Sequence, residues 1–127
     1  MTIDYVQALA KAYPEITAIW LIGSRADGSN SPVSDWDYIA IADDMTLSAL
    51  SEDSSFNNPA IDLLIVYDGD QFRKPWADGN RVKKGSLSNW EWQQTSALEA
   101  TYKATKARKG GDIFPPATQG RARRVFP

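Results

Sequence analysis

Residues 19–43 read IWLIGSRADGSNSPVSDWDYIAIAD, and this stretch decides how the chain is interpreted. An apolar run breaks at Gly23-Ser24, a polar loop follows, and a second apolar run begins with Asp35 and Asp37. Short apolar runs rich in β-branched residues are typical of buried strands. Burying an ionised carboxylate is costly unless a cation compensates its charge. Two acids at the start of an apolar strand therefore predict a nearby cation.

The composition narrows the chemistry that the chain can perform. Its 127 residues, 43% hydrophobic and 24% charged, are typical of one soluble globular domain. The sequence contains no cysteine and no histidine, which excludes disulfides, thiolate nucleophiles, zinc–sulfur sites and the usual general base. No run approaches the ~20 apolar residues of a membrane span, and no signal peptide is recognisable. We therefore expect a cytoplasmic protein without membrane contact that uses carboxylates, hydroxyls, amines or hard metal ions.

The first half of the chain alternates helices and strands. We expect a helix over residues 2–13, strands over 16–22, 36–42 and 60–67, a helical turn over 25–27 and a short helix over 47–53. The period of two in the second strand places Asp35 and Asp37 on one face and the aromatic residues Trp36 and Tyr38 on the other. The pattern predicts an α/β (α+β) fold, with a small mixed sheet of three to five strands packed by helices.

The second half is harder to interpret. Residues 82–92 alternate loosely and indicate a fourth strand, whereas residues 93–109 are spaced as a helix that ends at Gly110-Gly111. Residues 103–127 hold seven Lys or Arg against one Asp, while the preceding part holds seven basic and fifteen acidic residues. We predict a domain over 1–109 and a basic tail with Pro and Gly over 110–127. The tail would neutralise the acidic body or contact an anionic partner.

A third carboxylate, Asp62, lies near the start of the third expected strand. If the two acid-bearing strands are neighbours, Asp35, Asp37 and Asp62 converge at one edge of the sheet. Such crowding favours Mg²⁺ or Mn²⁺, and two ions about 3.5–4 Å apart form the clamp used for displacement at phosphorus. Gly23-Ser24 fits this chemistry, because backbone N–H groups at a helix start and a serine hydroxyl can hold phosphate oxygens.

These residues form a motif: G-S at Gly23-Ser24, ten residues, then D-x-D at Asp35 and Asp37, with Asp62 in the next apolar strand. The motif resembles that of the minimal nucleotidyltransferase domains of the DNA polymerase β superfamily, over about the first half of the chain. The resemblance implies two Mg²⁺ (or Mn²⁺) ions and a nucleoside triphosphate donor, with ATP expected. It implies transfer of the nucleoside monophosphate to an acceptor hydroxyl or phosphate, on a protein, an RNA or a small molecule, with release of pyrophosphate.

The resemblance also implies a role for each motif residue. Asp35 and Asp37 would bind both metal ions, and Asp62 would bind the catalytic ion and help to orient or deprotonate the acceptor oxygen. The glycine and serine of the turn would bind the β- and γ-phosphates, and Arg25 would contact a phosphate. Domains of this size often act beside a second chain, so the resemblance further suggests a helical partner of the HEPN type, as in toxin–antitoxin pairs.

Plainer interpretations stay open at this point. Gly23-Ser24 is also compatible with an ordinary turn capped by serine, and the strand acids with solvated surface charges. Asp68 and Asp70 compete with Asp62 for the third position, although their glycine-containing setting is typical of a turn.

Two other functions also stay open. One is a non-catalytic binding module, antitoxin-like or regulatory, whose basic tail contacts a partner. The other is a nucleic-acid-directed transferase, which the acidic body disfavours. Trp20 and Trp36 are expected in the core, whereas Trp76, Trp90 and Trp92 could stack on a ligand or contact a partner.

Overall fold

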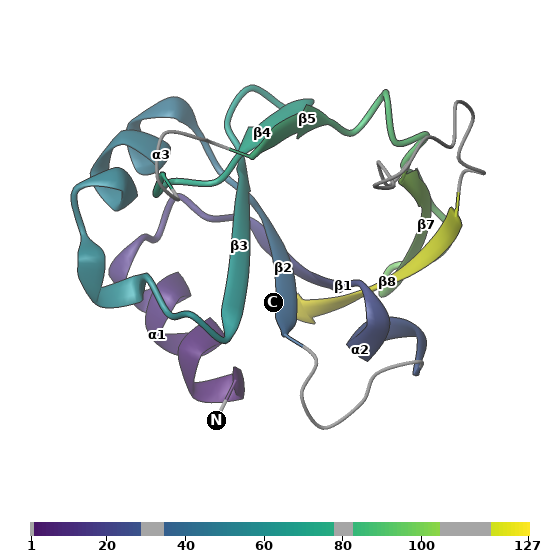
Figure 1. Ribbon diagram of the computed structural model, residues 1–127, viewed down its shortest axis with the longest axis horizontal. Helices are drawn as coiled ribbons and strands as arrows, with labels where there is room; N and C mark the ends of the chain where they lie inside the picture. Colours follow the sequence, from purple (N-terminus) through teal and green to yellow (C-terminus); the bar gives the residue numbers. More distant parts are fainter. Residues whose placement is uncertain (1, 29–34, 78–82, 105–117) are drawn as a thin grey trace, which may run out of the picture.

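The computed structural model describes residues 2–28, 35–77, 83–104 and 118–127. Figure 1 shows a strongly curled sheet with the two longer helices on its outer side. The helical elements are α1 (Thr2–Ala12), α2 (Ser24–Asp27), α3 (Asp44–Ser51) and the short 3-10 helix η1 (Ser54–Phe56). The strands are β1 (Ala18–Ile22), β2 (Trp36–Ile41), β3 (Ile61–Val66), β4 (Gln71–Arg73), β5 (Lys84–Ser86), β6 (Gln93–Gln94), β7 (Glu99–Ala104) and β8 (Thr118–Phe126). No helix within these described ranges is long and apolar enough to cross a membrane.

The sheet has the strand order β5-β4-β3-β2-β1-β8-β7-β6. Strands β2 and β3 pair in parallel, and the remaining pairs are antiparallel. The expected mixed α+β architecture is therefore confirmed. The expected number of three to five strands is wrong, because the described part of the chain already contributes eight strands to the sheet.

The elements of the first half form where local signals place them. All five residues of β1 are buried, as its continuous apolar sequence predicts. Helix α3 begins three residues earlier than expected, because the Asp43 side chain caps it and accepts a hydrogen bond from the Thr46 N–H at 2.8 Å. Local capping chemistry therefore sets the boundary that periodicity missed.

Two apolar layers cover the two faces of the sheet. The outer layer packs α1 and α3 on the sheet and includes Leu9, Leu50 and Leu63. The inner layer fills the concave side and includes Leu64 and Phe72. Alternate residues of each central strand enter opposite layers, as a period of two requires.

Aromatic rings join the two ends of the curled sheet on its inner side. The Trp90 ring lies 4.7 Å from Phe72 of β4 and 5.2 Å from Tyr102 of β7, measured between ring centroids. The Trp92 ring lies 5.3 Å from Trp20, which is buried in β1 as expected. Trp90 and Trp92 are therefore packing residues of the inner layer, so the sequence-based alternative of a partner surface is not needed to explain them.

The helix expected over residues 93–109 is wrong in the part that the structure describes. Gln93–Gln94 and Glu99–Ala104 are the strands β6 and β7, which pair with each other. Ala100 and Tyr102 are buried while Glu99 and Lys103 are exposed, which is the alternation of a strand with one covered face. Residues 105–117, including the expected stop at Gly110-Gly111, lie outside the described residues.

The last part of the segment expected as a basic tail over residues 110–127 lies in the sheet. Thr118–Phe126 form β8, which lies between β1 and β7 in the sheet. Ala122 is buried in the inner layer, whereas Arg121 and Arg123 are exposed. The basic residues of this segment thus belong to a central strand, and the boundary at residue 110 does not separate it from the sheet.

Candidate functional site

Two of the three predicted carboxylates lie side by side on neighbouring strands. Asp37 of β2 is the register partner of Asp62 in the parallel strand β3. Trp36 and Tyr38 belong to the outer layer, so the residue between them alternates to the inner face. Asp35 directly precedes β2 and is exposed. The adjacency expected for acids on neighbouring strands is therefore present for Asp37 and Asp62.

A cavity of about 750 Å³ opens at this end of the two strands. Its charged lining consists of Asp35, Asp62, Lys74 and Lys83, and Trp76 adds an aromatic side. Cavities of ~300–1,000 Å³ are the size class that holds small-molecule ligands and cofactors. The cavity thus combines space for a small molecule with two carboxylates and two amines.

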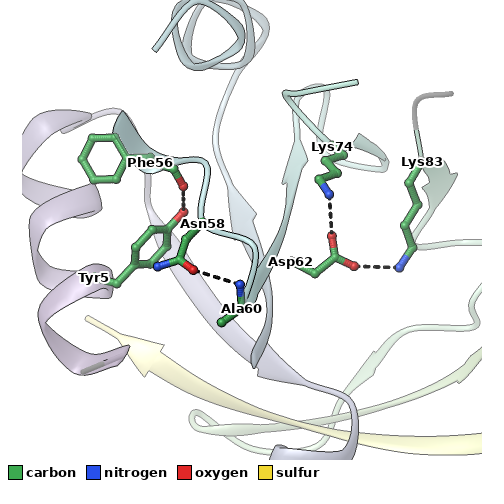
Figure 2. Close-up of polar contacts among 7 residues, drawn as sticks. All are labelled: Tyr5, Phe56, Asn58, Ala60, Asp62, Lys74 and Lys83. Atoms are coloured by element: carbon green, nitrogen blue, oxygen red, sulfur yellow. Dashed lines mark hydrogen bonds and ion pairs between the residues drawn. The ribbon is translucent and has the colours of Figure 1, made fainter. Parts of the chain in front are cut away.

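Asp62 is held by both lysines of the cavity (Figure 2). Its Oδ2 atom accepts a hydrogen bond from the Lys83 Nζ at 3.0 Å. The Lys74 Nζ lies 3.7 Å from Oδ1, which is within ion-pair range but too long for a hydrogen bond. The Asp62 and Lys74 side chains are each 23% exposed, whereas the Lys83 side chain is 55% exposed. These ion pairs supply the cationic compensation that an acid in an apolar strand requires.

The neutral wall of the cavity is formed by residues 57–59 and is anchored by hydrogen bonds. Figure 2 shows the Asn58 side chain accepting from the Ala60 N–H, at 2.9 Å, and the Tyr5 hydroxyl donating to the Phe56 carbonyl, at 2.8 Å. Burial, and to a lesser degree the neighbouring Tyr38, raise the pKa of Tyr5, so this hydroxyl keeps its proton over the working pH range.

Trp76, which also lines the cavity, is held by a hydrogen bond. Its indole N–H donates to the Asp53 carbonyl at 3.2 Å, and the Asp53 carboxylate accepts from the Tyr13 hydroxyl at 2.7 Å. Burial, followed by the hydrogen bond to Asp53, raises the pKa of Tyr13 to about 12. Hydrogen bonds from Ser55 and then Tyr13 lower the pKa of Asp53. The walls of the cavity are therefore fixed by side chains outside the predicted site.

Gly23 has a conformation that only glycine adopts readily. Its backbone has φ 73° and ψ −159°, and a Cβ atom there would lie 2.5 Å from Oδ2 of Asp37. The Gly23 N–H donates to the Tyr102 hydroxyl at 2.8 Å. This amide, which the sequence assigns to a phosphate, is thus hydrogen-bonded to β7. Ser24 begins α2, a helix of only four residues.

Arg25 lies over an aromatic ring of the site-bearing strand. Its guanidinium carbon is 4.2 Å from the centroid of the Trp36 ring, which is a cation–π distance. Trp36 is packed against the outer layer, on the face opposite to Asp37. The phosphate contact predicted for Arg25 remains a prediction.

A hard metal ion suits the donors of this site in kind. Carboxylate oxygens are the ligands that Mg²⁺ prefers, and Oδ1 of Asp62 is buried without a hydrogen-bond donor among the described residues. Within the same part of the chain, no group of three or more His, Cys, Asp or Glu side chains could hold a metal ion. A cation bound to Asp62 would compete with the two lysines for the carboxylate.

Sequence reasoning missed Lys74, Lys83 and Tyr102. Asp62 in an apolar strand did indicate a cation, but several basic residues follow it and nothing in their spacing distinguishes the two that bind it. Residues 99–104, which include Tyr102, alternate between apolar and polar side chains as a strand does. Interpreting this segment as part of a helix hid that pattern.

The sequence matches no family model and no curated protein. Among solved structures, the chain is similar to a protein from Sulfolobus solfataricus that is provisionally named a nucleotidyltransferase. The sequence identity is 20%, the TM-score is 0.44, and the likeness covers 68% of this chain and 75% of that chain. A likeness of this degree does not bear on the activity of the chain, which has to be judged from its own residues.

Proposed function

We propose that this chain is a metal-dependent nucleotidyltransferase that moves a nucleoside monophosphate from a nucleoside triphosphate, with ATP the expected donor, to an acceptor hydroxyl. The observation that carries the proposal is the registered pair of Asp37 and Asp62 on the inner face of the sheet. Asp35 and Asp62 line a cavity large enough for the donor. In-line displacement at phosphorus needs this combination of converging carboxylates and open space.

Each residue has a defined task in this proposal. Asp35, Asp37 and Asp62 would hold two Mg²⁺ or Mn²⁺ ions, which when bound would neutralise the charge that develops on the phosphate oxygens. Asp62 would accept the proton of the acceptor hydroxyl, whose oxygen then forms a bond to the α-phosphorus. The bond between the α-phosphorus and the bridging oxygen breaks, and pyrophosphate leaves. Gly23 and Ser24 would position the β- and γ-phosphates.

The transfer is tested with ATP labelled at the α-phosphate, Mg²⁺ and the material that co-purifies with the protein. Label should move to an acceptor with the parent protein and should be lost with Asp37→Asn, which keeps the shape of the side chain and removes its charge. Asp44→Asn, at an exposed position on α3, is the matched control and should retain transfer. Absence of transfer by the parent, or equal transfer by Asp37→Asn, would contradict the proposal.

A non-catalytic binding module is the second candidate, and it has structural support of its own. Asp62 is compensated by two lysines, and the Gly23 N–H is hydrogen-bonded to Tyr102. The Asp62 carboxylate and the Gly23 N–H thus each have a partner within the protein and do not need a nucleotide to provide one. An antitoxin-like or regulatory chain of this kind would act by contact with a partner, for which a helical HEPN-type chain is one candidate and a nucleic acid a weaker one. The Asp37→Asn variant of such a chain would bind the partner with the same affinity as the parent protein.

A further inference from the structure

We propose that Lys74 and Lys83 exchange partners during ligand binding: they neutralise Asp62 in the free protein and bind triphosphate oxygens once a divalent ion occupies the carboxylate. This inference rests on the proposed function and deepens it. Its consequence is that the metal and the triphosphate bind cooperatively, because each removes the partner that hinders the other.

The two lysines are placed opposite each other by the backbone. The Lys74 N–H donates to the Lys83 carbonyl at 2.8 Å, next to the β4–β5 pair. Both ammonium groups reach the same carboxylate, one at each oxygen. A single acid thus faces two bases, and the three groups together carry one excess positive charge.

The contact with Lys74 leaves Asp62 incompletely satisfied. Oδ1 is buried, and the 3.7 Å distance to the Lys74 Nζ is too long for a hydrogen bond. Mg²⁺ binds carboxylate oxygens at about 2.0–2.1 Å and would satisfy this atom better. The present arrangement is therefore one that a metal ion can replace.

The charges of the cavity explain why the exchange should be coupled. Its lining carries two carboxylates, Asp35 and Asp62, and two ammonium groups, so it is close to neutral. A divalent ion alone would be repelled by two ammonium groups as well as attracted by the carboxylates. A phosphate alone would be repelled by two carboxylates as well as attracted by the ammonium groups, so in each case repulsion offsets attraction. When both arrive together, the ion takes the carboxylates and the phosphate takes the lysines.

The lysines have the freedom that an exchange requires. The Lys83 side chain is 55% exposed, and its four-carbon stem can rotate toward a ligand in the cavity. Lys74 lines the same cavity and is 23% exposed, so its ammonium group can meet a phosphate with less movement. An ammonium group is a common phosphate ligand and needs no fixed geometry.

The exchange predicts opposite changes in two affinities when a lysine loses its charge. In Lys83→Met and Lys74→Met, Mn²⁺ alone should bind at least about fivefold more tightly, because Asp62 is released. Mn²⁺ with a non-hydrolysable ATP analogue should bind at least about fivefold more weakly, because a phosphate ligand is lost. Mn²⁺ affinity is measured by the electron paramagnetic resonance of the free ion, and analogue affinity by calorimetry.

Three further variants complete the test. Lys84→Met removes the charge of the exposed lysine next to Lys83 in the sequence, at the start of β5, and should leave both affinities unchanged. Lys83→Arg keeps the charge and should stay close to the parent. Asp62→Asn releases the lysines and should bind inorganic tripolyphosphate more tightly than the parent in the presence of a chelator.

The outcomes separate this inference from the proposed function. If the parent binds neither Mn²⁺ nor the analogue, the proposed function and the inference both fail. If the parent binds both ligands but the Met variants change both affinities in the same direction, or change neither, the exchange is refuted and the proposed function stands. A folding defect would move both affinities downward, so the opposite signs also exclude a merely structural effect.

Discussion

Replacing Gly23 by alanine should disturb both the stability of the fold and the geometry of the candidate site. The backbone of Gly23 has φ 73° and ψ −159°, a region that residues with a Cβ atom avoid. The new Cβ would lie 2.5 Å from Oδ2 of Asp37, so the carboxylate or the turn has to move. The same substitution therefore strains the turn and displaces a predicted metal ligand.

The backbone strain sets the expected loss in the free energy of unfolding. Holding a residue with a side chain in this backbone region costs about 1–3 kcal/mol. Gly28 is the matched control: its φ of 82° and ψ of 4° place it in the left-handed helical region, where alanine costs about 1–2 kcal/mol. A Cβ at Gly28 meets no atom within 4 Å in the described part of the chain. Gly28→Ala should thus lose stability without displacing Asp37.

Urea unfolding of the two variants, together with Mn²⁺ binding, separates the effects. We expect both variants to lose free energy of unfolding, and only Gly23→Ala to lose Mn²⁺ affinity. If Gly23→Ala kept the stability and the Mn²⁺ affinity of Gly28→Ala, the close contact between the turn and Asp37 would not exist in solution.

Other changes test the supports of the site and of the fold. Tyr102→Phe removes the acceptor of the Gly23 N–H and should lower the free energy of unfolding by about 1–3 kcal/mol in urea, with near-ultraviolet dichroism of the packed aromatic rings retained; an unchanged midpoint would contradict the hydrogen bond. Hydrogen bonds from Thr46, first from its side chain and then from its backbone, lower the pKa of Asp43 below the ordinary value of an aspartate. This carboxylate therefore stabilises the fold at pH values above that ordinary pKa, and the stabilisation is lost as the pH falls through the lower folded-state pKa. Asp43→Asn should match the parent near neutral pH, because asparagine caps helices equally well, and should show a smaller loss of stability in acid, as urea titrations at several pH values would reveal; equal acid sensitivity would refute the assignment. Deleting residues 118–127 removes the strand between β1 and β7 and should abolish cooperative unfolding, whereas a folded truncated chain by circular dichroism would show that this strand is dispensable.

The first half of the fold was predictable because its signals are local. Strands β1 and β3 are nearly continuous apolar runs, and Pro14 follows closely on the end of α1. The adjacency of Asp37 and Asp62 was expected on the condition that their strands are neighbours, and the pairing of β2 with β3 meets this condition. For the strands and the helix end, the residues that carry the signal lie within a few positions of one another.

Strand β8 was not predictable because its inward-facing residues are small. Strand β8 presents Gly120 and Ala122 to the inner layer, where Gly120 leaves room for the Tyr102 ring, so the strand lacks the apolar alternation that identifies a sheet. Its exposed arginines instead resemble a solvated tail. The strand forms because both its neighbours, β1 and β7, supply ladder partners from distant parts of the chain. Pairing of this kind is set by tertiary structure and leaves little trace in local composition.

The position of β8 bears on the site as well as on the fold. The motif residues lie in the first half of the chain, but β1, which leads into the Gly23 turn, is paired with β8 along its second edge. Strand β7 in turn supplies the Tyr102 hydroxyl that holds the Gly23 N–H. A fragment that ended after β3 would leave β1 with an open edge, and the turn would lose its hydrogen-bond acceptor. The carboxylate site therefore depends on the C-terminal strands, and the chain should bind metal and nucleotide as one cooperative unit rather than through a separable catalytic half.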